Sequence, residues 1–490
     1  MKKINLILAV AGMAGVTILG TTSCDDKLNA LPSQEVVYEN LIYDSNSAEV
    51  ALNGVYYSYA LCSEDYNGIK CAGNPMYTDI LPSFFAGTMT SDNWWGEMLE
   101  PGASSDENVN YLWTTIYNRF VSSNYVIEAT EKLDSKIFKG NRKNEIIAEA
   151  RTIRAIGHYN ALLYFGYSWD IDSPYGAVLR DKVMSVSAIP AGRASVMDTY
   201  NSILADLDYA IENASDNCSN YRFSKWFAEG FKAKVLLHRG QEGDYAEAAR
   251  LCSDIIENGP YELEGNTMDI YRTLGLDSKE IIFAIKPKPE QATVMDGFYT
   301  YSNDMFNLTP AVAALYARTD TRKADAAMSQ DTVDAATVVM ADGLALYLRH
   351  YTMEQIDNYD VNAISETMVE MRLSEIYLLC AEALLRQNMV DEALPLIKDV
   401  EMHAGVTDFT AFDAISSTDG AMEELFKEFV RNFVGESGID AAVMLRFPKN
   451  LVQTVSSKFE TEEYYILPIP TEEFDANSGL DRIKDQNPGY

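Results

Sequence analysis

The feature that most constrains the fold of this chain is a helical pattern that occurs twice. Residues 243–260, GDYAEAARLCSDIIENGP, begin at a turn glycine, carry the small residue Ala248 inside the helix, and end at a proline. Residues 372–400, RLSEIYLLCAEALLRQNMVDEALPLIKDV, repeat the pattern, with Ala381 in a first helix and Ala393 in a second. Small residues at such points let two antiparallel helices approach closely, and each pair leaves an apolar face that a neighbour must cover. The pattern therefore predicts a stacked, mostly α-helical scaffold.

The spacing in residues 243–260 resembles the second helix of a tetratricopeptide unit. Residues 145–214 and 422–447 are weaker candidates for further pairs, so we expect about four tetratricopeptide-like helix pairs. Apolar residues also recur at helical spacing in residues 48–60, 112–133, 145–164, 196–213, 225–238 and 245–257. A chain of 490 residues is long enough to build one large body from such units.

Two stretches break the helical pattern and are rich in loops. Residues 280–287, EIIFAIKP, are branched and aromatic and predict a short strand, and no sustained period follows them. Functional contacts tend to lie on loops whose ends a scaffold fixes. We therefore expect the scaffold over residues 112–260 and 366–447, and ligand-facing loops with a few short strands over residues 62–110 and 274–363.

The N-terminus has the order of a bacterial export signal. Lys2 and Lys3 precede an uncharged apolar stretch, residues 4–20, and small residues follow it. A membrane-spanning anchor is the alternative. Against that alternative, the stretch is at the short edge of what spans a bilayer, and no basic cluster follows it.

Cys24 follows these small residues directly. A small residue before a cysteine at the end of a leader resembles a bacterial lipoprotein box, although Thr21 stands where leucine is commoner. In that motif the cysteine is acylated and becomes the first residue of the mature chain. We therefore expect a signal peptide over residues 1–23, a tether over residues 24–37, and a single body that continues to residue 490.

Charge and cysteine spacing exclude several classes of protein. A formal net charge of −34 argues against a nucleic-acid partner, whose phosphates need basic residues. No pair of cysteines has the spacing of a zinc site, and the histidines lack partners at metal-binding spacing, so no metal or cofactor is expected. Cys62 and Cys71 could close a short loop in an oxidising compartment, whereas Cys252 and Cys380 are expected to be small core residues.

Five stretches in this order resemble the SusD/RagB family of outer-membrane nutrient-binding lipoproteins. They are AEARTIRAIGHYNALLYFGYSWD (148–170), MRLSEIYLLCAEALL (371–385), FKEFVRNFVGESGIDAAVMLRFP (426–448), YYILPIPTEEFDAN (464–477) and QNPGY (486–490). The resemblance covers nearly the whole mature chain. One departure is the Gly-Glu-Ser-Gly run at residues 435–438, where members usually have Glu-Gly-x-Arg, which leaves the packing there open.

The resemblance implies a SusD-like fold, in which a helical scaffold holds loops over a binding surface. It also implies capture of oligosaccharides at the cell surface and delivery to a SusC-like TonB-dependent outer-membrane transporter, on which the protein sits as a lid. The membrane is reached through the lipid anchor. Some relatives bind peptides or other nutrients, so that alternative stays open.

Aromatic residues in the loops are the candidates for ligand contacts. Sugar rings present flat C–H faces, so a binding surface needs exposed aromatic platforms with Asn, Asp or Arg beside them. The chain has 30 Tyr, 19 Phe and 5 Trp, many of them outside the helical stripes. The first choice is Asp92, Asn93, Trp94 and Trp95 in TSDNWWGEM, where starch-binding members of the family also contact sugar. The second choice is Phe298, Tyr299 and Tyr301 in DGFYTYSNDMF, and Tyr66, Asn67, Asn74 and Tyr77 are weaker candidates.

Other readings of these residues stay open. A tryptophan of the first group could simply fill the helical body. Arg151 and Arg154 are interpreted as structural ion-pair residues, as is Arg372 near Glu375 and Glu382. Catalysis is not expected, because no nucleophile elbow, phosphate-binding glycine loop or H-E-x-x-H helix occurs, although a pair of carboxylates for glycoside hydrolysis is not excluded. An adaptor that only docks another protein is a third class.

Overall fold

The computed structural model describes residues 41–61, 81–90, 104–105, 107–183, 190–285, 307–316, 319–322, 367–459, 462 and 465–490. The chain divides into residues 1–41 and a compact unit of residues 42–490. Cys24, the expected leader and tether, and the Cys62–Cys71 pair lie outside the described residues. No helix within the described ranges is long and apolar enough to cross a membrane.

The described part of residues 42–490 is mostly helical. The longer helices are α2 (Ser45–Leu61), α5 (Glu107–Phe120), α6 (Ser123–Glu131), α7 (Arg142–Phe165), α8 (Val196–Asn213), α9 (Lys225–Arg239), α10 (Asp244–Asn258), α15 (Leu373–Leu385), α16 (Val390–His403), α17 (Thr418–Phe433) and α18 (Ile439–Arg446). The short ones are α3 (Leu81–Ala86), α12 (Pro310–Ala313), α19 (Lys449–Val452), α20 (Thr471–Ala476), the 3-10 turns η3 (Ser135–Ile137), η5 (Gly275–Asp277) and η8 (Phe412–Ala414), and the π-helical turn η4 (Ile270–Leu274). The strands are β1 (Met89–Thr90), β2 (Ile281–Ile285), β3 (Asn307–Leu308) and β4 (Met368–Arg372).

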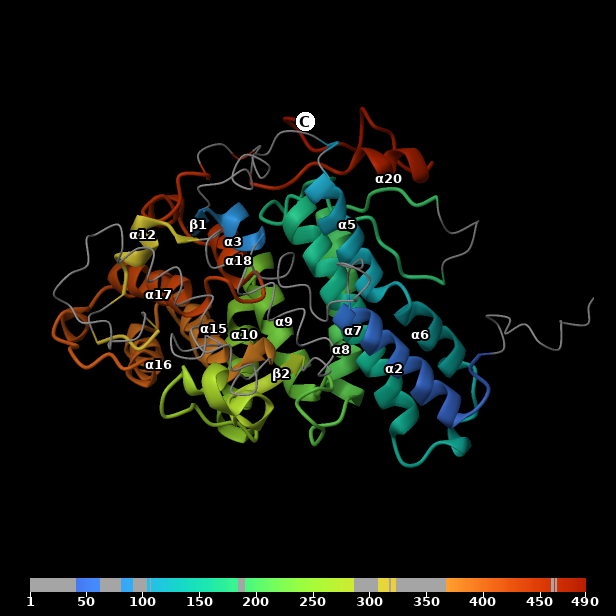
Figure 1. Cartoon of the computed structure of the whole chain (residues 1–490), viewed down its shortest axis with the longest axis horizontal. Coiled ribbons are helices and arrows are strands. Elements are labelled where there is room, and N and C mark those ends of the chain that lie inside the picture. Colours follow the sequence, from blue (N-terminus) through green and yellow to red (C-terminus); the bar gives the residue numbers. More distant parts are fainter. Residues whose placement is uncertain are drawn as a thin grey trace, which may run out of the picture. The chain divides into compact units, whose positions relative to one another are not determined.

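The long helices pack in a continuous series. Helix α7 packs on α8, α8 on α9, α9 on α10, α10 on α15 and α15 on α16, and α17 packs against both α15 and α18 (Figure 1). The predicted helix in residues 243–260 is α10, which begins after the left-handed Gly243 at φ 86°. The predicted pair in residues 372–400 is α15 and α16, where Ala381 and Ala393 are fully buried. The mostly α-helical fold expected from the repeat is therefore confirmed.

The prediction of one helix over residues 112–133 is wrong, because the structure divides it into α5 and α6. The chain turns at Val121 and Ser122, and the Ser123 hydroxyl donates a hydrogen bond of 2.6 Å to the carbonyl of Phe120. Serine side chains that bond to nearby backbone groups compete with the helical ladder. The Ser123 side chain therefore competes with the helical ladder where α5 ends, although the apolar spacing continues across the break.

Helices α5 and α7 approach so closely that one contact point requires a glycine. A Cβ atom placed on Gly157 in α7 would lie 2.0 Å from the Cδ1 atom of Phe120 in α5. The Phe120 ring is fully buried and packs edge-on against His158, with 4.8 Å between the ring centroids. The ring therefore fills the space that a side chain at position 157 would need.

The C-terminal residues pack onto the end of α7. The Asn487 amide donates to the carbonyls of Phe165, at 3.1 Å, and of Leu467, at 2.6 Å. The Arg193 guanidinium donates to the carbonyls of Phe165 and Asp485. Because these donors are buried or half-buried, the last turn of α7 and the C-terminal segment are held as one structural unit.

Candidate functional site

The short ladder of β1 and β3 fixes the ends of two predicted ligand loops at one place. Its register pairs Met89 with Leu308 and Thr90 with Asn307 in antiparallel order. Residues 91–103 follow β1 directly, and residues 286–306 directly precede β3. In an antiparallel pair these two ends are adjacent, so the points where the two predicted loops attach to the body lie next to each other.

All seven candidates of the first and second choice belong to these two segments. Asp92, Asn93, Trp94 and Trp95 belong to residues 91–103, and Phe298, Tyr299 and Tyr301 belong to residues 286–306, so they lie outside the described residues. The weaker candidates Tyr66, Asn67, Asn74 and Tyr77 lie outside them as well. The structure brings together the points where the two loops attach.

The second ladder holds the other end of residues 286–306. Strands β2 and β4 are antiparallel, and Ile285, the last residue of β2, pairs with Met368, the first of β4. The strand predicted in residues 280–287 is β2, which is buried along its length. The two ladders together therefore fix both ends of this loop to the helical body.

Helices α3 and α18 hold β1 in position. The Thr88 hydroxyl donates to Asp440 Oδ2 at 2.5 Å, and the Thr88 amide donates to the carbonyl of Ser83 at 3.1 Å. The Ser83 hydroxyl in turn accepts the amide of Gly435 at 2.9 Å. Because Thr88, Asp440 and Ser83 are fully buried, these bonds keep full strength and anchor the start of the first loop.

The Gly-Glu-Ser-Gly run that departs from the family pattern forms part of this anchor. Gly435, Ser437 and Gly438 all have positive φ, at 70°, 48° and 64°. The Ser437 hydroxyl donates to the carbonyl of Val369 in β4 at 3.0 Å. Glycine adopts this backbone without strain, so the run makes the tight turn that joins α17 to α18 beside both ladders.

Arg372 at the end of β4 joins the second ladder to α17. Its guanidinium is fully buried and lies 2.9 Å from Glu436 Oε1 and 3.1 Å from Glu280 Oε1, and it also donates to Ser374 and Asn432. A buried charge is tolerated when it is paired and hydrogen-bonded, as it is here. Arg372 therefore connects the strands to the helical scaffold through side chains on three segments.

The expected pairing of Arg372 with Glu375 and Glu382 is wrong. Glu375 lies 2.6 Å from Lys234 Nζ, and Glu382 lies 2.9 Å from Arg446 Nε. The reason is that Arg372 belongs to the end of β4 and not to α15, so its side chain does not follow the helical spacing.

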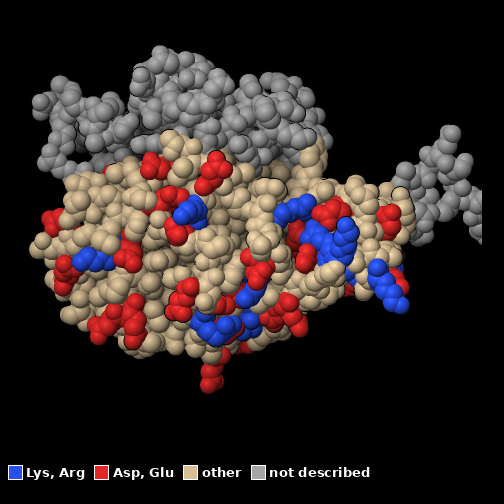
Figure 2. All heavy atoms as spheres, turned by 90° about the horizontal axis from the view of Figure 1, so that it is seen from below, with Lys and Arg blue, Asp and Glu red and all other residues tan. Residues whose placement is uncertain are grey.

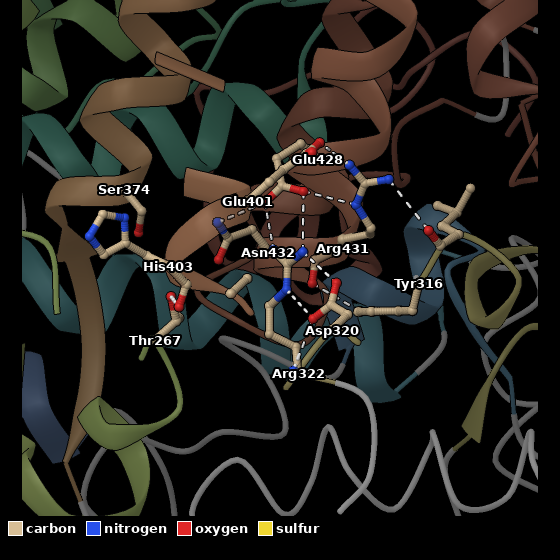
Figure 3. Close-up of polar contacts among 12 residues, drawn as sticks. Thr267, Tyr316, Asp320, Arg322, Ser374, Glu401, His403, Glu428, Arg431 and Asn432 are labelled. Carbon is tan, nitrogen blue, oxygen red and sulfur yellow. Dashed lines mark hydrogen bonds and ion pairs between the residues drawn. The ribbon is translucent and has the colours of Figure 1, made fainter. Parts of the chain in front are cut away.

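A second buried charge cluster lies beside the described residues 319–322. Figure 3 shows Arg322 between Asp320, at 2.7 Å, and Glu428, at 2.5 Å. Glu428 also accepts from Arg431, whose guanidinium lies 2.6 Å from both Glu401 and Glu424. Burial, followed by the neighbouring Glu428 carboxylate, raises the pKa of Glu401 above its usual value. The neutral form of Glu401 is therefore favoured, which relieves the excess of carboxylates over guanidinium groups.

A row of aromatic rings extends from α3, next to the first ladder. The ring centroids are 6.0 Å apart for Phe85 and Phe459, 5.1 Å for Phe459 and Tyr465, and 5.4 Å for Tyr465 and Trp169. Trp169 and Tyr465 are half-buried, so each ring keeps an exposed part. Both residues fall in the family-like stretches 148–170 and 464–477, but they lie outside the stretches 62–110 and 274–363 from which the sequence candidates were chosen.

Most of the structural interpretations made from the sequence are confirmed. Arg154 donates two bonds to Asp206, at 2.7 and 2.8 Å, and joins α7 to α8, while Arg151 lies 3.2 Å from Glu131. Cys252 and Cys380 are buried.

Comparison with known families gives matches over two separate parts of the chain. A family model described as "Starch-binding associating with outer membrane", SusD-like_3, matches residues 47–237, and the "SusD family" model, SusD_RagB, matches residues 291–438. A "SusD-like protein" of Bacteroides ovatus is 29% identical over 192 residues, which span 38% of this chain and 34% of that protein. "SusD-like protein P25" of Formosa agariphila is 22% identical over 438 residues, which span 78% of this chain and 80% of the relative.

Solved structures share the fold over nearly the whole chain. A SusD superfamily protein of Bacteroides thetaiotaomicron superposes with a TM-score of 0.69 at 20% identity, covering 91% of this chain and 100% of the other. NanU of B. fragilis gives a TM-score of 0.68 at 16% identity, covering 94% and 100%. A "putative sugar binding protein" of Bacteroides vulgatus gives 0.65 at 19% identity, covering 92% and 99%.

Proposed function

The chain belongs to the SusD/RagB family, and from this premise we propose that it is a cell-surface lipoprotein that captures an oligosaccharide for import. In this proposal residues 1–23 are the export signal, Cys24 carries the lipid, and the protein is held on the outer membrane. A SusC-like TonB-dependent transporter receives the captured ligand. A family model described as starch-binding and a solved structure described as a putative sugar binding protein support a carbohydrate over a peptide or another nutrient.

The β1–β3 ladder is the observation that carries the proposed binding site. Trp94 is four positions after Thr90, and Tyr301 is six positions before Asn307. An extended chain spans at most about 3.6 Å per residue, so these aromatic residues lie within about 14 Å and about 22 Å of one shared ladder. Two aromatic groups attached so near each other suit a ligand with several flat sugar rings.

Polar neighbours would give such a site its specificity. We propose that Trp94, Trp95, Phe298, Tyr299 and Tyr301 stack on sugar faces, while Asp92 and Asn93 bond to hydroxyl groups. Ligand sites commonly combine apolar walls with a few polar groups that set orientation. Trp169 and Tyr465 are candidates for an additional contact, since they are half-buried in the aromatic row that starts near the same ladder.

A polysaccharide panel tests the proposal directly. The purified protein is run through gels that contain single polysaccharides, and each mixture is assayed for new reducing ends. Retarded migration without new reducing ends supports capture. Release of sugar would instead identify an enzyme, and a transporter that co-purifies without any retardation would favour an adaptor.

The double variant Trp94→Ala/Trp95→Ala locates the site. Loss of stacked rings is expected to weaken capture by at least about tenfold, since each aromatic–ligand stack is worth on the order of 1 kcal/mol. The matched control is Tyr57→Ala/Tyr221→Ala, which removes two exposed rings from the helical body. Unchanged affinity in the tryptophan variant, with circular dichroism unchanged, would remove the proposed platform.

A further inference from the structure

The connection between α6 and α7 carries a basic corner, formed by Lys132, Lys136 and Lys139. The segment EKLDSKIFKGNRK, residues 131–143, has five basic and two acidic residues in a chain whose net charge is −34. All three lysines of the basic corner are exposed. Figure 2 shows several blue side chains toward the end of the molecule at which α2, α6 and α7 lie in Figure 1.

The lysines of the basic corner are not neutralised by the described residues. Lys232, Lys398 and Lys427 each lie within 2.7 Å of a carboxylate oxygen, whereas no such ion pair occurs for Lys132, Lys136 or Lys139 within the described ranges. The two acidic residues of the segment are already engaged. Glu131 pairs with Arg151 at 3.2 Å, and Asp134 accepts the backbone amide of Lys136 at 3.0 Å.

The backbone of the basic corner is fixed, so the three charges keep a common location. The Lys143 ammonium donates to the carbonyls of Glu131, at 3.0 Å, and Leu133, at 2.5 Å. Phe138 is buried, while Ile137 beside it is 44% exposed. The result is a firm turn that presents three lysines, which no described carboxylate pairs with, on the same short segment as the exposed Ile137.

The basic corner lies where the chain enters the compact unit. The amide of Ile42 donates to the Tyr125 hydroxyl in α6 at 3.3 Å, and Arg142 lies 2.8 Å from Glu49 in the first turns of α2. At 1.5 Å per residue, Lys132 is about 10 Å along α6 from Tyr125. Cys24 is 18 positions before Ile42, so the chain between them reaches at most about 60 Å.

We propose that the basic corner is a second membrane contact, which binds the phosphates of anionic lipid headgroups. The inference rests on the lipid anchor at Cys24 in the proposed function. A single acylated residue allows the body any orientation, whereas a basic patch next to the tether would hold one face toward the lipid surface. Each lysine near an anionic surface contributes about 1 kcal/mol, equal to about fivefold in partitioning, and Ile137 would insert at the interface.

The test uses the mature lipidated protein, in which mass analysis has first checked for the lipid on Cys24. It measures how strongly this protein prefers anionic over zwitterionic vesicles. The protein is allowed to distribute between zwitterionic phosphatidylcholine vesicles and vesicles with added phosphatidylglycerol. The variant Lys132→Gln/Lys136→Gln/Lys139→Gln should reduce the preference for anionic vesicles by at least about tenfold at 0.05 M salt. The preference of the unmodified protein should also fall as salt rises, because the screening length shortens.

A control of equal charge separates a local patch from overall charge. Lys279→Gln/Lys398→Gln/Lys484→Gln removes three lysines on other elements and should leave the vesicle preference unchanged. The proposal is overturned if both variants lose the same preference for anionic vesicles, or if the unmodified protein shows no such preference. Mass analysis that finds no lipid on Cys24 overturns it too. Polysaccharide capture in the corner variant reports separately on the proposed function, since that assay does not involve the membrane.

Discussion

Replacing Gly157 by alanine tests the close approach of α5 and α7. The new Cβ would lie 2.0, 2.5 and 2.6 Å from three atoms of the Phe120 ring, where contacts between carbon atoms are normally about 3.5–4.0 Å. Phe120 is fully buried against His158 and Tyr117, so the ring has no open space to enter. Overpacking of this kind costs about 3 kcal/mol, at the upper end of the usual range.

Part of that cost is offset by the backbone. Alanine is favoured over glycine inside a helix by about 0.8–1.0 kcal/mol, so the net loss for Gly157→Ala should be about 2 kcal/mol. Gly54 in α2 is the matched control, because it is exposed and a Cβ there meets nothing within 4 Å. Gly54→Ala should therefore raise the free energy of unfolding by about 1 kcal/mol.

Urea unfolding of the two variants measures both effects. The midpoints should move in opposite directions at similar slopes, and the free energies of unfolding should differ by about 3 kcal/mol. In a Phe120→Leu background the Gly157→Ala substitution should cost less, because the ring that it meets is gone. A Gly157→Ala variant as stable as the unmodified protein would refute the reasoning.

Two further substitutions test buried polar groups. Glu401→Gln should reduce the loss of stability between pH 5 and pH 8. Because the pKa of Glu401 is raised in the native protein, this group contributes its full stabilisation below pH 4.5, the pKa of the unfolded chain, and the stabilisation is lost as pH rises toward the native pKa. If the urea midpoint fell equally with pH in both proteins, this reasoning would be contradicted. Asn487→Ala should lower the free energy of unfolding by about 1–3 kcal/mol, because two carbonyls lose their buried donor. The control Asn217→Ala changes an exposed side chain and should alter the free energy of unfolding little. Equal losses in the two variants would argue against a stabilising role for the bonds of Asn487.

The helical part of the fold could be predicted because its signals are local. Gly243 and the apolar spacing after it set the start and the buried face of α10, and the residues predicted for α8 are those of the observed helix. The prediction did not contain the break between α5 and α6, because the bond from Ser123 to the backbone changes the path of the chain without interrupting the apolar spacing. Periodicity measures burial, and it does not detect a turn that keeps the same face buried.

The anchors of the candidate site could not be predicted in the same way. Arg372 bonds to Glu280 and Glu436, which are 92 and 64 positions away, so sequence neighbourhood gave it the wrong partners. The pairing of Thr90 with Asn307 joins segments more than two hundred positions apart and depends on only two residues per strand. Such short strands carry no detectable alternation, so their pairing has no sequence signal of its own.

The β1–β3 ladder also separates two kinds of evolutionary change. Because Thr90 and Asn307 need only remain about 5 Å apart, residues inserted or deleted beyond them leave the register of every helix intact. Changes in these two segments would thus leave the scaffold intact, whereas substitutions at Thr88, Asp440 or Arg372 would lower the stability of the body itself. The two residue pairs of this ladder therefore mark the positions at which the segments of one relative could be exchanged for those of another without changing the helical body.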